Sequence, residues 1–214
     1  MNTARRLLLA VAVLGCMSAC TPFATDEPPP ARYLLIAPAE DGAYGELGWL
    51  PAPLSLARPI VPAGLDGERI GVIHGQRRLD YVADARWAEP LPDLLHRVLA
   101  ASLAPAMEPG MPGAGSRTGA RYVIELRFER FHPVYPAENG VPPRIEVGLV
   151  AALVDRSDGR VLARARGQHS ARADENRLGV IIAHLETALH EAFAEAMVGI
   201  HAGLDEDGGR AVAD

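Results

Sequence analysis

The sequence contains no lysine and only two cysteines, and aromatic side chains make up 5% of its 214 residues. Both cysteines, Cys16 and Cys20, lie close to the N-terminus, so the rest of the chain has no thiol for a disulfide framework or a cysteine-ligated metal site. A core with few aromatic rings must be built from leucine, valine, isoleucine and alanine. The formal net charge of −6 argues against a nucleic-acid partner and against a polybasic membrane-binding patch, because both need a dense positive surface.

The N-terminus has the pattern of a bacterial lipoprotein signal peptide. Arg5 and Arg6 precede an apolar run over Leu7–Leu14, which is too short to span a bilayer core of about 30 Å. Cys20 has small residues immediately before it and gives the more ordinary signal length, whereas Cys16 has the better residue three positions back. We therefore predict a signal peptide over residues 1–19 and lipidation at Cys20. Two alternatives stay open, which are lipidation at Cys16 and a secreted protein cleaved just before Cys20.

The residues after the signal peptide predict how the protein is held at a membrane. Residues 20–31 are polar and proline-rich, which is typical of a semi-extended tether. Neither cysteine is followed by aspartate, and under the sorting rule of enteric bacteria this favours the inner leaflet of the outer membrane, facing the periplasm. An acylated cysteine normally carries several chains, so we expect stable anchoring.

The first half of the folded region, which begins at Arg32, predicts short strands and a hairpin. A first strand is expected over Tyr33–Ile36. Prolines restrict a second strand to an edge position or to Leu54–Arg58. Arg69–Ile73 and Arg78–Val82 flank a tight polar loop, which predicts a β-hairpin.

A helix is expected after this hairpin. Its apolar residues recur at helical spacing in one stripe, from a start at Pro90 or Pro92 to an end near Ala104. His96 and Arg97 lie off the stripe, so we expect them on the exposed side.

The second half of the chain supplies more strands. Residues Tyr122–Glu129 alternate between apolar and polar side chains, which predicts a strand with one polar face. A loop is expected over His132–Pro143, followed by a strand over Ile145–Leu153. A turn at Asp158–Gly159 leads to a returning strand over Val161–Gln168.

A second, long helix should end the folded part. Asp174 is a suitable N-cap, and a stripe of apolar residues runs from Leu178 to Ile200. Residues 202–214 are acidic and glycine-rich and predict a disordered tail. The folded domain is accordingly placed at residues 32–201.

Together these elements predict an α+β fold, a two-layer sandwich in which two helices pack on one face of a mixed or mainly antiparallel sheet. The other face of the sheet should be more polar and free to meet water or a partner. Its candidate residues are Glu125, Arg127, Glu129, Arg144 and Glu146.

No residue pattern predicts catalysis, a cofactor or a metal site. His184 and His190 lie six residues apart on one helix, a spacing that keeps them from meeting, and no serine lies in a nucleophile elbow. Glu125 and Glu129 alternate with Arg127 on a strand, where cross-strand charge pairing explains them better than glycoside hydrolysis. Catalytic, cofactor-binding and metal-ligating residues are therefore all expected to be absent.

The two tryptophans have different expected roles. Trp87 lies between a strand and a helix and is expected to cap the core. Trp49 lies in the proline-rich segment, where greater exposure makes it the candidate interface residue.

Several runs carry a family resemblance. Leu79-Asp80-Tyr81 is followed by Arg86-Trp87-Ala88-Glu89-Pro90-Leu91-Pro92, and later by the run Tyr122–Phe131 and a long final helix. With the cysteine-terminated signal, these runs resemble the ABC-type transport auxiliary lipoprotein family (PqiC-like) over roughly residues 32–200. The most specific residues of the resemblance, for which we expect structural roles, are Leu79, Asp80, Tyr81, Arg86, Trp87 and Pro90.

The resemblance implies a role as a partner protein without catalytic residues. Such lipoproteins accompany MCE-domain proteins and an ABC permease and ATPase, in systems thought to move phospholipids or other hydrophobic molecules across the Gram-negative envelope. It implies an outer-membrane docking subunit with the capacity to form a homo-oligomeric ring. Two alternatives stay open: an accessory lipoprotein of outer-membrane assembly or lipopolysaccharide export, and an envelope hydrolase.

Overall fold

A mixed seven-stranded sheet with two helices forms the domain. The computed structural model describes residues 29–37, 50–51, 53–75, 77–104, 120–138 and 140–211, with side chains in the last stretch as far as residue 205. The predicted lipidation sites Cys16 and Cys20 and the candidate interface residue Trp49 lie outside the described residues. The strands are β1 (Ala31–Tyr33), β2 (Leu54–Leu56), β3 (Arg69–His74), β4 (Arg78–Trp87), β5 (Tyr122–Tyr135), β6 (Arg144–Asp155) and β7 (Arg160–Arg172), and the helices are α2 (Leu91–Leu103) and α3 (Leu178–Ala211).

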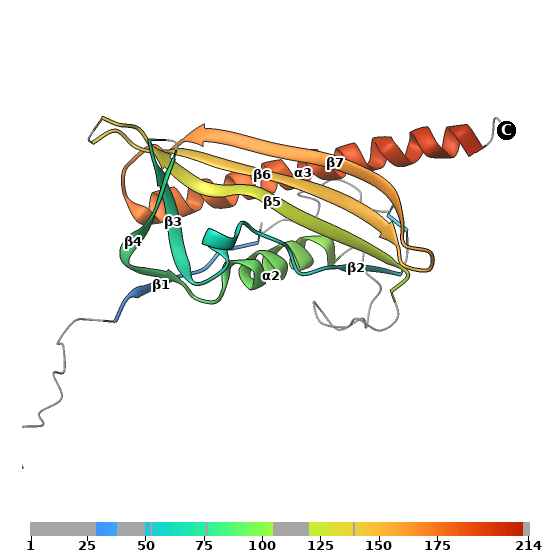
Figure 1. Cartoon of the computed structure of the whole chain (residues 1–214), viewed down its shortest axis with the longest axis horizontal. Coiled ribbons are helices and arrows are strands. Elements are labelled where there is room, and N and C mark those ends of the chain that lie inside the picture. The colour runs from blue at the N-terminus through green and yellow to red at the C-terminus, as the bar shows by residue number, and fades with distance from the viewer. Residues whose placement is uncertain are drawn as a thin grey trace, which may run out of the picture.

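The strand order is β1-β4-β3-β5-β6-β7, with the short β2 also paired to β5. The hairpin pairs β3/β4, β5/β6 and β6/β7 are antiparallel, whereas β1/β4, β2/β5 and β3/β5 are parallel. Long strands β5, β6 and β7 run along the length of the molecule (Figure 1). The predicted mixed sheet and the hairpin are confirmed, but β4 continues past the predicted end at Val82 to Trp87, because residues 85–87 pair with β1.

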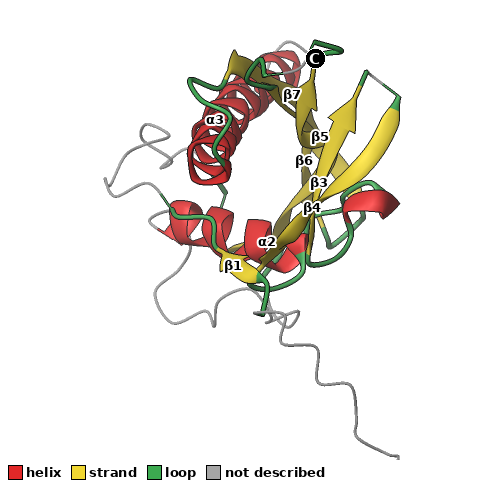
Figure 2. Cartoon of the chain, turned by 90° about the vertical axis from the view of Figure 1, so that its left-hand side faces the viewer, coloured by secondary structure: helices red, strands yellow, loops and turns green. Residues whose placement is uncertain are grey.

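Both helices pack on the same side of the sheet, and this confirms the predicted two-layer α+β architecture (Figure 2). The alternation in β6 turns Ile145, Val147, Leu149, Ala151 and Leu153 toward the helices, where each is at most 1% exposed. In the described part of the chain the opposite face carries no α-helix, and only the short 3-10 turn Ala63–Leu65 lies over its β3–β4 end (Figure 2). One face of the sheet is therefore core and the other is open.

Helix α3 approaches strand β7 closely because the residues between them are small. A side chain on Gly167 would place its Cβ 1.7 Å from the carbonyl oxygen of Ala192. Gly199 and Gly203 face Ala165 and Ala163 in the same way, at 2.5 and 3.3 Å from the position of an added Cβ. This row of glycine and alanine lets the helix backbone lie almost directly on the strand.

Most of the few aromatic residues of the core gather at one point. Trp87, at the end of β4, is 2% exposed and lies 6.4 Å from Phe131 between ring centroids. Phe128 meets Phe131 edge to face at 6.0 Å, a favourable arrangement of ring quadrupoles. Trp87 is thus a core residue, as its position between strand and helix predicts.

The first strand lies earlier than the sequence predicts. Strand β1 covers Ala31–Tyr33, and the apolar residues that follow leave the sheet for helix α3. There the Ile36 N–H donates to Glu186 Oε1 at 2.8 Å, and His190 Nε2 lies 3.2 Å from the Ile36 carbonyl oxygen. Helix side chains replace a neighbouring strand as hydrogen-bond partners, so extended backbone here does not become sheet.

Strand β5 is longer than predicted. The expected loop over His132–Pro143 begins only after Tyr135, because β6 and β3 both pair with the end of β5. Pro133 lies opposite Ile145, and Val134 lies beside Ile73. Pairing on both sides thus holds the strand as far as Tyr135.

Helix α3 also differs at both ends from the prediction. Asp174 is not its N-cap: the first helical hydrogen bond joins the Ile181 N–H to the Arg177 carbonyl oxygen, and Asp174 lies 3.2 Å from His184 Nε2 instead. The helix backbone runs on to Ala211, through much of the segment that the sequence predicts as a disordered tail. Leu204 still packs against the core, which explains why the helix does not stop near residue 201.

His96 is buried, not exposed as its position off the apolar stripe predicts. It is 6% exposed, and its Nδ1 lies 3.3 Å from the carbonyl oxygen of Ala57. The segment after β2 covers this side of α2, where Arg58 also pairs with Asp93 at 2.6 Å. Two sides of α2 are therefore covered, whereas a single stripe predicts only one.

Replacing Gly167 by alanine should destabilise the protein. The new methyl group would collide with the backbone of α3, and overpacking of this kind typically costs about 1–3 kcal/mol. Thermal unfolding followed by circular dichroism should show a lower Tm. The matched control is Gly179→Ala in α3. No atom of another part of the structure lies within 4 Å of the Cβ that this change adds, so we expect an unchanged or higher Tm. Equal Tm values for Gly167→Ala and the wild type would contradict the described contact.

Candidate binding face of the sheet

The residues that mark the family resemblance lie at one end of the sheet. Tyr81 donates its hydroxyl hydrogen to the Gly64 carbonyl oxygen at 2.9 Å, and Leu79 packs over Gly64 and Gly71. The guanidinium group of Arg69 lies 3.6 Å above the Tyr81 ring. Leu79 and Tyr81 thereby hold the short 3-10 turn Ala63–Leu65 against the hairpin.

The other marker residues lie where strand β4 leads into helix α2. Trp87 donates its backbone N–H to the Glu68 carbonyl oxygen at 2.7 Å, and Pro90 is the N-cap of α2. In the strand register, Arg86 lies opposite Arg32 on β1 and opposite Arg69 on β3. Asp80 accepts the Tyr81 N–H at 2.9 Å. The marker residues thus form packing and turn contacts at this corner of the fold, and the binding surface has to be sought elsewhere.

The open face of strands β5, β6 and β7 is lined by cross-strand rows of polar side chains. One row joins Glu125, Ala152 and Arg164, and the next joins Arg127, Val150 and Arg166. Charged residues therefore stand on the outer two strands, and small apolar residues form the floor on β6. The exposed residues Glu125, Arg127 and Glu129 confirm the polar face that the alternation in this strand predicts.

The open face carries a positive charge although the whole chain is acidic. Arginines outnumber glutamates on this face, which the net charge of −6 for the whole chain does not reveal. The net charge argues only against a dense polybasic membrane-binding surface, and it does not report this local excess of arginine. The charged residues of the open face are the six arginines Arg127, Arg130, Arg144, Arg164, Arg166 and Arg172 and the three glutamates Glu125, Glu129 and Glu146.

Four of these arginines are already engaged. Arg144 pairs with Glu146, Arg166 lies 3.7 Å from Glu129, and Arg172 donates to the Pro142 carbonyl oxygen at 2.9 Å. Arg130 crosses the floor of the face, because Gly148 leaves room beneath it, and donates to Gln168 Oε1 at 3.3 Å.

Two arginines on this face remain available. Among the described residues, Arg127 and Arg164 form no ion pair or side-chain hydrogen bond. They flank a hollow of about 470 Å³ whose lining includes Glu125, Val150, Ala152 and Arg166. The arrangement offers free guanidinium groups around an apolar floor, which can bind an anion but has no nucleophile to act on it.

At the far end of the same face His132 stands beside Glu146 in the cross-strand register. Burial lowers the pKa of His132, and the positive charge of Arg130 lowers it further, while Glu146 acts in the opposite direction. The imidazole is accordingly held neutral, so it adds no charge to the face at neutral pH.

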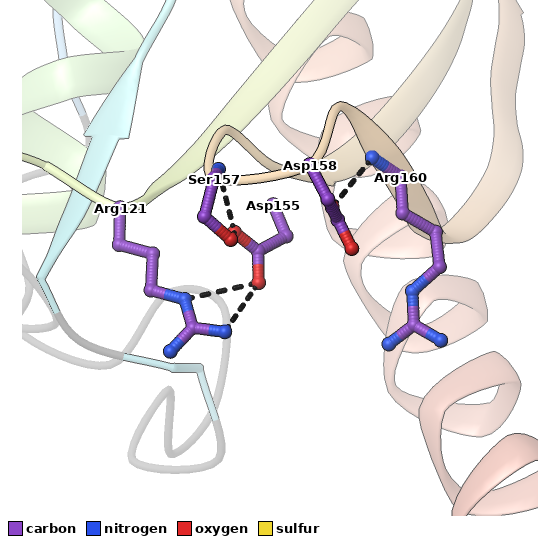
Figure 3. A network of polar contacts seen from close by, with 5 residues as sticks. All are labelled: Arg121, Asp155, Ser157, Asp158 and Arg160. Atoms are coloured by element: carbon purple, nitrogen blue, oxygen red, sulfur yellow. Dashed lines mark hydrogen bonds and ion pairs between the residues drawn. The ribbon is translucent and has the colours of Figure 1, made fainter.

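A buried carboxylate fixes the other end of the open face (Figure 3). Asp155, at the end of β6, accepts two hydrogen bonds from Arg121 at 3.0 and 2.7 Å. It also accepts the Ser157 N–H at 2.9 Å and the Ser157 hydroxyl at 2.6 Å. These donors, led by the Arg121 hydrogen bonds, hold the pKa of Asp155 far below its usual range. The network ties the β6–β7 turn to the start of β5, and thereby fixes the register that brings Arg127 and Arg164 to the hollow.

Other parts of the described chain offer weaker candidates for a functional site. The described residues contain no group of three or more histidine, cysteine, aspartate or glutamate side chains able to hold a metal ion. A second hollow, of about 410 Å³, lies at the start of α3 beside Asp174, Arg177 and His184. In the described ranges no helix is both long and apolar enough to cross a membrane.

Sequence reasoning identified only part of the open face. It named Glu125, Arg127 and Glu129 on β5 and Arg144 and Glu146 on β6, but no residue of β7, where the structure places Arg164, Arg166 and Gln168. The signal was present, since these residues alternate with Ala163, Ala165 and Gly167. A row of very small residues at every second position indicates the side of a strand that a helix covers, and so assigns the arginines to the free side.

Comparison with known proteins gives a family and a fold. A family model described as ABC-type transport auxiliary lipoprotein component matches residues 33–197. The crystal structure of a Xanthomonas campestris protein from the family DUF330 has a TM-score of 0.61 at 20% identity, covering 84% of this chain and 97% of that one. A crystal structure of a protein described as uncharacterised has a TM-score of 0.57 at 16% identity, covering 76% and 93% of the two chains. No curated protein matches the chain. At these identities the two structures show a shared fold alone.

Replacing Asp155 by asparagine should lower stability in a pH-dependent manner. The folded pKa of this carboxyl lies below its unfolded value of about 4, so its contribution is complete above that pH and is lost as the pH falls through the folded value. Thermal unfolding should therefore show a lower Tm for Asp155→Asn at pH 7 and a diminishing difference below pH ~4.

The matched control for this change is Asp158→Asn in the same turn. Among the described residues, Asp158 accepts a single hydrogen bond, from the Arg160 N–H at 2.9 Å, so its effect should be smaller. A difference between Asp155→Asn and the wild type that stays constant down to acidic pH would contradict the role of the carboxylate.

Proposed function

The chain belongs to the ABC-type transport auxiliary lipoprotein component family, and from this premise we propose that it is a lipid-anchored docking subunit of an MCE-type transport system. In this role it binds an MCE-domain protein and the ABC permease and ATPase of the same system. The system moves phospholipids or other hydrophobic molecules across the Gram-negative envelope. The protein stands on the inner leaflet of the outer membrane and faces the periplasm.

The extent of the family match carries this proposal. Residues 33–197 include the end of β1, the other six strands of the sheet, α2 and most of α3, so the likeness covers the domain and not an isolated motif. The family is described as an auxiliary component of transport, which supports a non-enzymatic role. The open face of the sheet provides a free surface for such a role.

The position of β1 supports an anchored orientation. This strand begins at Ala31, directly after the predicted tether, and lies at one end of the molecule, with the β6–β7 turn at the other (Figure 1). A fully extended tether over residues 20–31 would reach about 40 Å from the acylated cysteine. The proposed anchor therefore leaves the long strands and the far end of α3 free to contact a partner.

The main alternative partner is a β-barrel of outer-membrane assembly or of lipopolysaccharide export. It requires the same anchor and the same free surface, so only the identity of the partner separates the two proposals. An envelope hydrolase is a weaker alternative, because it would need a catalytic group to be added to the described surface.

Crosslinking in the native envelope tests the choice of partner. After mild crosslinking, detergent extraction and purification of the full lipoprotein, mass spectrometry should identify an MCE-domain protein together with an ABC permease and ATPase. A β-barrel protein in their place would favour the alternative. Recovery of the lipoprotein alone would contradict both docking proposals.

Replacing Cys20 by alanine tests the anchor. If Cys20 carries the acyl chains, Cys20→Ala should abolish metabolic labelling with palmitate and remove the protein from the outer-membrane fraction. Cys16→Ala is the matched control and should leave labelling intact. Persistent labelling of Cys20→Ala, with loss in Cys16→Ala, would move the lipidation site to Cys16.

A further inference from the structure

The hollow on the open face combines two features that rarely occur together on an acidic protein. Arg127 on β5 and Arg164 on β7 stand on either side of strand β6 in neighbouring cross-strand rows. Their backbones are about 12 Å apart, because two strand spacings of about 4.8 Å and two residues of about 3.4 Å along the strand separate them. Val150 and Ala152 form the floor between them. Cations and apolar atoms therefore face the same small volume.

Unpaired arginines indicate an anionic ligand. A guanidinium group binds phosphate or carboxylate oxygens through parallel hydrogen bonds, and it gains most where it does not already serve a carboxylate of its own protein. The available groups, Arg127 and Arg164, meet this condition among the described residues, whereas Arg144 and Arg166 have acidic neighbours.

The apolar surroundings favour an amphiphile over a free anion or an acidic peptide. Ile60 lies beside Arg127 in the sheet and is 54% exposed, and Val161 at the start of β7 is 44% exposed. Large exposed apolar side chains next to unpaired cations suit a ligand with a hydrocarbon part attached to its charged group. Inorganic phosphate or an acidic peptide would use the arginines and leave these side chains in water.

Glu125 gives the hollow a third feature. Its carboxylate lines the same volume as the arginines and, among the described residues, forms no ion pair. A lone negative charge beside guanidinium groups would repel a simple anion, but it would attract an ammonium group carried by the same ligand. The three charged side chains therefore match a headgroup that bears a phosphate and an ammonium.

We propose that this hollow is a binding site for the phosphoethanolamine headgroup of a glycerophospholipid. Arg127 and Arg164 bind the phosphodiester, Glu125 binds the ammonium, and the first part of the acyl chains lies on Val150, Ala152 and Ile60. The site is independent of the docking partner, because its occupation requires only the lipid.

Calorimetric titration tests the site. The full lipoprotein in non-ionic detergent is titrated with dihexanoyl phosphatidylethanolamine, and the double variant Arg127→Gln/Arg164→Gln is titrated in the same micelles. Because partitioning of the lipid into micelles is the same for both proteins, the difference between them reports the site. We expect the double variant to bind at least about tenfold more weakly, as for the loss of hydrogen bonds to a charged group.

Two controls sharpen the comparison. Arg97→Gln removes an equally charged side chain from helix α2, where it pairs with Glu89 at 2.8 Å, and should leave the affinity unchanged. Glu125→Gln should abolish the preference for dihexanoyl phosphatidylethanolamine over dihexanoyl phosphatidylglycerol. All of these positions are outside the core, and circular dichroism would verify that each variant is folded.

The proposal would be overturned by equal affinities of the wild type and the double variant. Binding of inorganic phosphate as tightly as the lipid would also overturn it, since the apolar floor would then contribute nothing. A preference between headgroups that persists in Glu125→Gln would remove the role of that residue. Each result stands apart from the crosslinking experiment, so failure of the lipid site and failure of the docking role are distinguishable.

Discussion

The contact between helix α3 and strand β7 determines which surface of this protein is free. The helix lies directly on the strand because Gly167 has no side chain, and because Ala163 and Ala165 on the same side of β7 are also small. Strand alternation then turns every intervening side chain of β7 away from the helix. Arg164 and Arg166 stand on the open face for this reason, so the position of the basic surface is a consequence of helix packing.

The same contact explains how much of the fold could be predicted from the sequence. Strand β6 and helix α2 could be predicted because their apolar periodicity reports a buried face, and the β3–β4 hairpin because two strand-like runs flank a tight polar loop. The strand at Tyr33–Ile36 was misplaced because Leu35 is buried against α3 and not in the sheet, and a local pattern does not distinguish the two environments. The end of β5 was missed because pairing with β3 and β6 outweighs the low strand preference of Pro133.

The open face shows why composition alone misjudges the surface. Net charge sums over the chain, whereas a ligand in contact responds to charges within a Debye length, which is about 8 Å at physiological ionic strength. Acidic residues beyond this distance are screened from the hollow, and the charged side chains that line it, Arg127, Arg164, Arg166 and Glu125, determine its potential. The sequence contained this information only in the register between β5 and β7, which depends on pairing with β6.

The network around Asp155 connects the register to the surface. An unpaired buried carboxylate would be expensive, so four hydrogen bonds from Arg121 and Ser157 fix where β6 ends relative to β5. A slip of one residue in this register would reverse the faces of β6 and bring its core side chains to the open side. The packing of α3 therefore determines which face of the sheet is open, and the Asp155 network determines the register of the strands on that face. The juxtaposition of two unpaired arginines over an apolar floor requires both the α3–β7 contact and the Asp155 network.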